Sequence, residues 1–451
     1  MIHGTESSRE RPRLLLVGDA VAPTGFARVM HNIIEPLKCY YEIHHLGTNY
    51  QGDPHGNDWK IYPAAAGGDL MGVRRLKPLV STLRPKLVFL LNDIWVQGDY
   101  MEQLREFQPD LKVVMYCPLD MGPIDPRFVE RLSGVDRFVT YTRFAKAQVE
   151  SAVAEVKRRK SDFVFPDVEV IPHGVDTQVF HPLEDKDPRA SRSRAIHAIL
   201  GNDPRAKDAF IALNANRNQP RKRIDITLKG FALFAKNKPR NVLLYLHMGI
   251  EDAGWDVLRL SERYGLGNRL LLSSPHRQLP CIPVDKLNIT YNAAAVGLNT
   301  SIGEGWGLAN FEHAATRAAQ IVPRHSAFTE LWEGSGVLVD PVASLTIEKI
   351  LWEGHLVSPE GVAEALERLY EDPVLLEELS AAAYRNATRP EYQWTAIARR
   401  WDAVFREALG REPEPAFHVR NGKRVAKSPL EHFPTMGAMR SPAAEVGLPV
   451  P

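Results

Sequence analysis

Residues 301–312 read Ser301-Ile302-Gly303-Glu304-Gly305-Trp306-Gly307-Leu308-Ala309-Asn310-Phe311-Glu312, and this stretch decides the fold. The apolar run 295–300 before it predicts a buried strand, and a helix is expected over about 308–319. The glycines of the intervening loop let the backbone approach a ligand closely and adopt positive φ. A strand, a glycine-rich loop and a helix in this order are typical of a parallel α/β sheet.

Two carboxylates, Glu304 and Glu312, bracket the junction between this loop and the helix. On one continuous helix they would lie roughly 12 Å apart. The acid/base pair of a glycosidase needs about 5–9.5 Å, so the spacing argues against that chemistry. With Glu304 in the loop, both carboxylates can face one ligand, accepting hydrogen bonds from hydroxyls beside a helix start that suits phosphate. A nucleotide sugar carries both groups. The alternative is a turn with a solvated Glu304 and a helix-stabilising Glu312.

The string Glu304-Gly-Trp-Gly-Leu-x-x-x-Glu312 resembles the E-x7-E signature of the retaining GT-B glycosyltransferases of family 4. The resemblance implies an α/β protein of the GT-B fold, with two Rossmann-like parallel-sheet domains facing a cleft and a C-terminal helix crossing back. It implies that Glu304 holds a donor-sugar hydroxyl and that Glu312 holds the ribose hydroxyls of the nucleotide. It also assigns stabilisation of the leaving diphosphate to the backbone N–H groups around Trp306, Gly307 and Leu308, and it makes Gly305 a further donor-binding candidate.

Size and composition fit this organisation. The 451 residues suffice for two domains, and 44% hydrophobic with 25% charged residues indicate a globular protein. A net charge of +1 gives no overall attraction to nucleic acid or membrane. Three dispersed cysteines favour a reducing compartment. Neither a transmembrane run nor a signal peptide is apparent, so a cytoplasmic location is expected, in the host cytoplasm if a phage encodes the chain.

The first half repeats the strand–loop–helix order. An apolar run at 13–19 predicts a strand, and the loop containing Thr24 and Gly25 leads into an amphipathic helix. The resemblance implies that Gly25 contacts the donor, although an ordinary turn would also explain it. Polar loops follow the predicted strands 41–46 and 86–91, and ligands of such sheets bind beyond the carboxyl ends of the strands. The acceptor candidates are Thr24, Asn49, Tyr50, Asp53, His55, Asn92 and Asp93. The alternative is that these residues simply form turns.

Two further stretches of the first half carry the resemblance. After the predicted strand 112–116, many family members place a histidine near the reacting sugar, and this sequence has Asp120 as the nearest polar residue. Asp120 is therefore a catalytic candidate. The segment 168–180 contains Val-Ile-Pro-His-Gly-Val-Asp, which resembles the end of the family's N-terminal domain. It makes His173 a donor-binding candidate, although the turn alone would explain this residue.

Basic residues cluster at 217–223, between a predicted strand and a predicted helix. Cations at such a junction can meet phosphate oxygens. The stretch resembles the family's R-x-x-x-x-K-G element, in which Arg217 and Lys222 would hold the donor diphosphate. Arg223 replaces the usual glycine. A solvated basic turn is the alternative.

The predicted organisation has six parts. A flexible N-terminus (1–12) precedes an acceptor domain (13–185), a linker (186–208) and a donor-binding domain (209–390). The returning helix (391–410) and an extended tail (411–451) follow.

The sequence thus predicts a retaining enzyme that moves a hexose from a UDP- or GDP-sugar to an acceptor hydroxyl, with no cofactor and no metal. A small sugar, a lipid-linked sugar and DNA remain open as acceptors. Two loop strings, Pro-Thr-Gly-Phe-Ala-Arg at 23–28 and Asn-Tyr-x-Gly-Asp-Pro-His at 49–55, resemble a phage and environmental branch. This makes 5-hydroxymethylpyrimidine in DNA a candidate acceptor, with the basic runs 157–160 and 420–427 on backbone phosphates. Solvated charges would explain those runs equally well. A non-catalytic nucleotide-sugar binder and a GT-B epimerase are the other readings.

Overall fold

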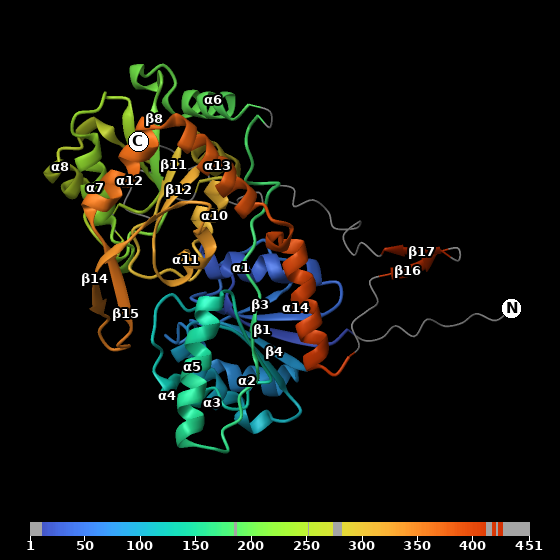
Figure 1. The fold of residues 1–451 in the computed structure, drawn as a ribbon. Coiled ribbons are helices and arrows are strands. Elements are labelled where there is room, and N and C mark those ends of the chain that lie inside the picture. Colours follow the sequence, from blue (N-terminus) through green and yellow to red (C-terminus); the bar gives the residue numbers. More distant parts are fainter. Residues whose placement is uncertain are drawn as a thin grey trace, which may run out of the picture.

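The computed structural model describes residues 11–184, 187–250, 252–273, 282–411, 417–420 and 423–426. Two parallel sheets, each covered by helices on both faces, form two domains that lie one above the other in Figure 1. Both sheets are built from strands that alternate with helices along the chain, as the sequence predicts.

The first domain contains a seven-stranded sheet. Its strands, in spatial order, are β3 (Lys60–Pro63), β2 (Glu42–Thr48), β1 (Arg13–Asp19), β4 (Leu87–Leu91), β5 (Lys112–Tyr116), β6 (Arg137–Thr140) and β7 (Val168–Val170). Its helices are α1 (Gly25–Ile34), α2 (Val73–Leu83), α3 (Ile94–Leu104), α4 (Pro126–Arg131) and α5 (Arg143–Arg159). Alternate residues of a strand serve opposite faces. Leu14 and Leu16 therefore pack with α1, whereas Leu15 and Val17 pack with α2 and α3.

The second domain contains a six-stranded sheet. Its strands, in spatial order, are β10 (Leu270–Leu272), β9 (Val242–Leu246), β8 (Phe210–Asn214), β11 (Val296–Leu298), β12 (Ala319–Pro323) and β13 (Val337–Val339). Its helices are α6 (Pro188–Leu200), α7 (Ile224–Ala235), α8 (Val257–Arg263), α9 (Val284–Ala293), α10 (Leu308–Ala314), α11 (Ser326–Trp332), α12 (Pro359–Glu371) and α13 (Pro373–Ala387).

In both sheets the order of the strands reverses at a switch point. This point lies between β1 and β4 in the first sheet and between β8 and β11 in the second. In open α/β sheets, ligands bind beyond the carboxyl ends of the strands at such a switch point. The loops that follow these strands carry most of the site residues predicted from the sequence. The topology therefore brings the two sets of loops to the boundary between the domains.

The last long helix, α14 (Trp394–Ala408), returns to the first domain, as predicted (Figure 1). Its apolar stripe packs against the first sheet, where the ring of Trp401 lies 4.7 Å from the rings of Phe89 and Tyr116. Phe405 continues the contact at 5.2 Å from Phe89. The amphipathic spacing of α14 thus buries aromatic rings in the core of a domain that starts some 380 residues earlier in the chain.

A hairpin that the sequence analysis does not anticipate extends from the second domain to the first. Strands β14 (Pro341–Thr346) and β15 (Glu353–Val357) pair antiparallel. Trp352, just before β15, is buried with its ring 5.8 Å from that of Trp95 on α3. The Glu353 amide donates to the Gly122 carbonyl at 2.8 Å. The hairpin therefore fastens the second domain to the first beside the loops after β4 and β5.

One predicted boundary is wrong. The helix expected over 308–319 ends at Ala314, and Ala319 begins strand β12. Arg317 adopts a left-handed conformation with φ of 63°, which turns the chain from the helix into the strand. In the predicted tail, β16 (Phe417–Arg420) pairs with β17 (Lys423–Ala426). The other tail residues after 411, and residues 1–10, lie outside the described residues.

Candidate active site

Glu304 and Lys222 form a buried ion pair at the switch point of the second sheet. Lys222 Nζ contacts Glu304 Oε2, and both residues are less than a tenth exposed. The Glu304 amide also donates to Ser326 Oγ at 3.1 Å. Burial by itself raises the pKa of Glu304, but the charges of Lys222 and Arg221 outweigh it, so the pKa of Glu304 lies below its usual value. Glu304 is therefore an ionised, fixed hydrogen-bond acceptor.

Arg221, next to Lys222, connects this pair to the first domain. Its Nη1 lies 3.1 Å from Asp120 Oδ2 and donates to the Gly303 carbonyl at 3.4 Å. Asp120 stands in the loop after β5, so the predicted catalytic candidates Asp120, Lys222 and Glu304 meet through Arg221. Arg221 belongs to the basic stretch 217–223, but the sequence alone predicts no separate role for it.

The glycines of the motif fit tightly against the first domain. A Cβ on Gly303 would lie 2.2 Å from Met121 Cγ, and one on Gly305 would lie 2.4 Å from Tyr141 Oη. Gly307 has φ of 82°, a conformation that other residues rarely adopt. Contact between the domains therefore explains Gly303 and Gly305, and the turn into α10 explains Gly307.

Glu312, the predicted ribose residue, lies on α10 with its side chain only 5% exposed. Arg28, from α1 of the first domain, pairs with Oε1 of Glu312. The Tyr291 hydroxyl donates to Oε2 at 3.4 Å. Gly25, at the start of α1, is close to the same region, because a Cβ on it would lie 3.3 Å from Leu308 Cδ1. The donor candidates Gly25, Leu308 and Glu312 are thus brought together.

On the first-domain side, Asp19 organises two of the acceptor candidates. It accepts hydrogen bonds from Thr24 Oγ1 at 2.6 Å, Thr48 Oγ1 at 2.5 Å and Asn49 Nδ2 at 2.9 Å. Thr24 also caps α1 by accepting from the Ala27 amide at 3.1 Å. Sequence reasoning missed Asp19 as a site residue, although its position as the last residue of the predicted first strand was a usable signal.

The candidates Asn92 and Asp93 follow β4. Gln97 donates to both the Asn92 and the Tyr116 carbonyls at 2.8 Å, which holds the loops after β4 and β5 together. Burial, together with the negative charge of Asp120, raises the pKa of Asp93 to about 6. Asp93 and Asp120 are thus close enough to interact electrostatically.

The remaining acceptor candidates form a separate turn. Tyr50 is buried and its hydroxyl donates to the Asp53 carbonyl at 2.6 Å. The His55 ring packs edge-on against Tyr50, with ring centroids 5.9 Å apart. Among the described residues, no hydrogen bond or ion pair joins these three side chains to Asp93 or Asp120. The structure therefore does not bring them to the Asp120–Arg221 pair.

His173 and Trp306 belong to a buried aromatic group at the domain boundary. His173 Nδ1 lies 2.9 Å from the Tyr116 hydroxyl, and its ring is 4.3 Å from that of Tyr141 and 5.6 Å from that of Trp306. Burial lowers the pKa of His173 to about 3, so the ring is neutral. Trp306 stacks on Phe311 at 4.7 Å. Both side chains pack in the core beneath the motif loop.

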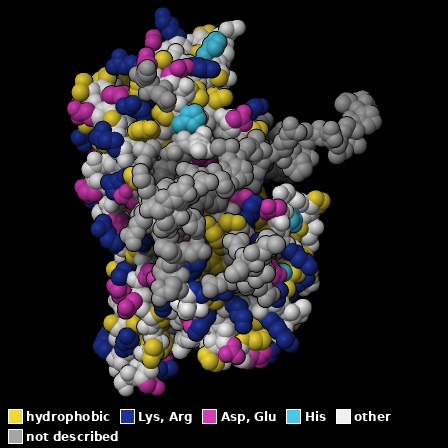
Figure 2. Space-filling model, turned by 90° about the vertical axis from the view of Figure 1, so that its right-hand side faces the viewer, with side chains coloured by type: hydrophobic (Ala, Val, Ile, Leu, Met, Phe, Trp, Pro, Cys, Tyr) yellow, Lys and Arg dark blue, Asp and Glu magenta, His cyan; other side chains and the backbone are white. Residues whose placement is uncertain are grey.

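Two other basic features predicted from the sequence are paired with carboxylates. Arg217 pairs at 3.0 Å with Asp252 and is nearly half exposed. At the end of α5, Arg158 and Arg159 pair with Glu155, and Lys160 pairs with Glu130 at 2.5 Å. These carboxylates neutralise much of the 157–160 run. On the face in Figure 2, basic and acidic side chains are interspersed over both domains.

Other ligand features are few in the part of the chain that the structure describes. There, no group of three His, Cys, Asp or Glu residues is arranged to hold a metal ion. No described helix is long and apolar enough to span a bilayer.

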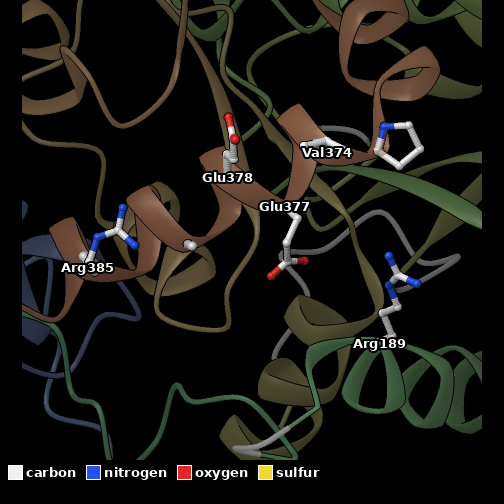
Figure 3. A pocket seen from close by; sticks show the side chains of 7 residues that line it. Arg189, Val374, Glu377, Glu378 and Arg385 are labelled. Carbon is white, nitrogen blue, oxygen red and sulfur yellow. The ribbon is translucent and has the colours of Figure 1, made fainter.

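An open pocket of about 650 Å³ lies between α6 and α13, where Arg189 faces side chains along α13 (Figure 3). Its lining residues are Arg189, Pro373, Val374, Glu377, Glu378, Ala381 and Arg385, none of which belongs to the site described above.

Comparison with curated proteins identifies relatives that match part of the chain. The chain is 30% identical over 250 residues to a D-inositol 3-phosphate glycosyltransferase of Thermobispora bispora, covering 54% of this chain and 51% of that protein. A protein of the same name from Streptomyces bingchenggensis is 29% identical over 251 residues, covering 54% of this chain and 48% of its own. The chain thus spans about half the length of the curated relatives it matches. No family model matches it.

Solved structures match over most of the chain. Sucrose-phosphate synthase from Thermosynechococcus elongatus has a TM-score of 0.63 at 17% identity, covering 89% of this chain and 99% of that one. The Anabaena protein HepE in complex with UDP and glucose has a TM-score of 0.63 at 13% identity, covering 88% and 100%. These likenesses show the fold. Two Rossmann-like domains with the returning α14 are the GT-B fold, which confirms the fold predicted from the sequence.

Proposed function

We propose that this protein is a retaining glycosyltransferase that transfers a hexose from a nucleotide-diphosphate sugar to an acceptor hydroxyl. The observation that carries the proposal is the Glu304–Lys222 pair at the switch point of the second sheet, joined through Arg221 to Asp120 in the loop after β5 of the first sheet. A charged acceptor for sugar hydroxyls, two cations for a diphosphate and a carboxylate on the opposite domain are the groups that this transfer requires. The names of the relatives, and of the solved structures with bound UDP, point the same way.

In the proposed reaction, the bond from the anomeric carbon to the diphosphate oxygen breaks as the acceptor oxygen bonds to that carbon on the same face. The acceptor proton passes to the leaving diphosphate. Lys222 and Arg221 stabilise the negative charge that develops on this group, and their fixed positions avoid reorganisation. Arg217, paired with Asp252 at the surface, is the weaker diphosphate candidate. Glu304 fixes the sugar, and Asp120 orients the acceptor.

The acceptor side favours a neutral polyhydroxyl compound. Asp19 is the last residue of β1, and Asp93 and Asp120 follow β4 and β5, so all three stand at the carboxyl ends of strands of the first sheet. Carboxylates accept hydrogen bonds from hydroxyls but repel phosphate. An acceptor that carries a phosphate, as in the name of the curated relatives, or a DNA phosphodiester therefore fits these loops less well. Because side chains neutralise the diphosphate, the proposal includes no resident metal.

The test is release of nucleoside diphosphate from a panel of UDP- and GDP-sugars, with neutral sugars, inositol phosphate and 5-hydroxymethylcytosine DNA as acceptors. We expect release that a neutral sugar stimulates and that a chelator leaves unchanged. Lys222→Gln should abolish it, whereas Lys229→Gln, at an exposed position of the following helix, should not. Stimulation by DNA or inositol phosphate would correct the acceptor class. No release from any donor would refute the transferase.

A further inference from the structure

The ion pair between Arg28 and Glu312 joins the two domains at the predicted ribose residue. Arg28 is 47% exposed in its side chain, whereas Glu312 is 5% exposed. In the described part of the chain, the partners of the Glu312 carboxylate are the Arg28 guanidinium and the Tyr291 hydroxyl. A carboxylate buried to this degree is costly without a cation, and the cation here comes from the opposite domain.

The position of Arg28 is fixed by its helix. The Thr24 side chain caps α1 and is itself held by Asp19 at 2.6 Å. Gly25 begins α1 against Leu308, the first residue of α10. Arg28 lies about one turn into α1 and Glu312 about one turn into α10, so the two helices present these side chains to each other.

We propose that Arg28 is a donor-positioning residue that acts through Glu312, holding its carboxylate in the orientation that accepts the ribose 2′- and 3′-hydroxyls of the nucleotide. This inference rests on the proposed function. An ionised carboxylate offers about four acceptor positions, so two partners leave room for two hydroxyls. Hydrogen bonds to a charged acceptor are about twice as strong as neutral ones. Ribose recognition is then completed only when the first domain supplies Arg28.

The proposal predicts a loss of nucleotide affinity that depends on the ribose hydroxyls. Calorimetric titration with UDP and GDP, and with their 2′,3′-dideoxy forms, separates a role through Glu312 from a role at the diphosphate. In Arg28→Gln we expect affinity for the ribonucleotide to fall about tenfold, with the dideoxy form changed less than twofold. Glu312→Gln should show the same pattern, and the double variant should be no weaker than Glu312→Gln.

Two further variants keep the test decisive. Arg28→Lys retains the positive charge, so we expect it to fold and to keep ribonucleotide affinity within about threefold. Arg143→Gln removes another arginine that spans the domains, 3.6 Å from Glu330, and should leave both affinities unchanged. Thermal melting of each variant with the dideoxy nucleotide reports that the fold and the diphosphate site persist.

Three results would overturn the inference. Equal losses for the ribo and dideoxy forms would place Arg28 on the phosphates. Tighter ribonucleotide binding by Arg28→Gln would mean that Arg28 competes with ribose. Unchanged affinities of Arg28→Gln for both forms would make the pair purely structural. Failure of the parent protein to bind any of these nucleotides would refute the proposed function together with this inference, and is distinct from the other three results.

Discussion

Asp120 and Arg221 belong to different domains, and their side chains meet with Arg221 Nη1 3.1 Å from Asp120 Oδ2. The pair lies beside Gly303, whose carbonyl Arg221 also contacts. A catalytic candidate of the first domain is thus coupled to the basic residues that follow the first strand of the second domain.

Asp120→Asn should separate the two roles of this residue. The pair is partly exposed, so we expect a loss of less than about 1 kcal/mol in the free energy of unfolding. If Asp120 orients the acceptor, acceptor-dependent transfer falls at least tenfold while donor hydrolysis persists. Kinetics with and without acceptor measure this. Asp125→Asn, in the same loop and paired with the exposed Arg127, is the control. An equal loss of donor binding would contradict the assignment.

Lys222→Met should strongly destabilise the protein. It leaves the Glu304 carboxylate buried without its main cation, which costs about 3–5 kcal/mol in comparable pairs. The double variant Lys222→Met/Glu304→Gln should recover part of this loss because the stranded charge is gone. Urea unfolding measures both. Equal stabilities of the single and double variants would show that Arg221 alone keeps Glu304 charged.

The pH dependence of stability should report on Asp93. Its pKa is about 6 in the folded protein against 3.8 for the ordinary group, so the folded state holds this proton more tightly. The resulting stabilisation, up to about 3 kcal/mol, is complete below pH 3.8 and is lost as the pH rises through 6. Asp93→Asn should remove this slope between pH 4 and 6. Unfolding midpoints across that range test it, and parallel curves for the two proteins would contradict it.

Gly305→Ala should disturb the domain boundary. The added Cβ would lie 2.4 Å from Tyr141 Oη and 2.7 Å from Tyr141 Cε2, so the ring must move, at a cost of about 1–3 kcal/mol. Adding Tyr141→Phe to Gly305→Ala removes the contact of the new Cβ with the tyrosine hydroxyl but not its contact with the ring. The double variant should therefore regain only part of the lost stability. Thermal melting of the single and double variants measures this. Full restoration would mean that only the hydroxyl matters.

The β14–β15 hairpin should contribute through Trp352. Trp352→Ala removes a buried ring that packs near Trp95, and such truncations cost about 3–5 kcal/mol. Val342→Ala on the same hairpin, where the side chain is 67% exposed, should change stability by less than about 0.5 kcal/mol. Chemical denaturation of both variants gives the comparison. Equal losses of stability for the two variants would show that the hairpin does not fasten the second domain to the first.

Sequence reasoning reached the alternating strands and helices because buried parallel strands such as β4 and amphipathic helices such as α14 have strong periodic signals. It did not reach the hairpin, because β14 is mostly exposed and its residues show no apolar alternation. The early end of α10 was also missed, since Arg317 turns the chain where a glycine would normally mark the turn.

The candidate site was likewise predicted from the sequence only in part. Glu304 and Glu312 were predicted from the motif and Lys222 from the basic stretch 217–223, and each follows a strand of the second sheet. The partners Arg28 and Asp120 come from the first domain, and Arg28 is 284 residues from Glu312 in the chain. Contacts over such separations depend on how the domains meet, which no local pattern of residues encodes.

Because α14 packs on the first sheet, the core of the first domain is not complete until α14 has been synthesised. The rings of Phe89 and Tyr116 are covered by Trp401 and Phe405, which the ribosome adds only after the whole of the second sheet. Until then, the nascent first domain exposes an aromatic surface, the kind of surface that makes folding intermediates prone to aggregate. We expect ribosome-bound chains that end before residue 394 to bind chaperones, and release to follow once α14 emerges.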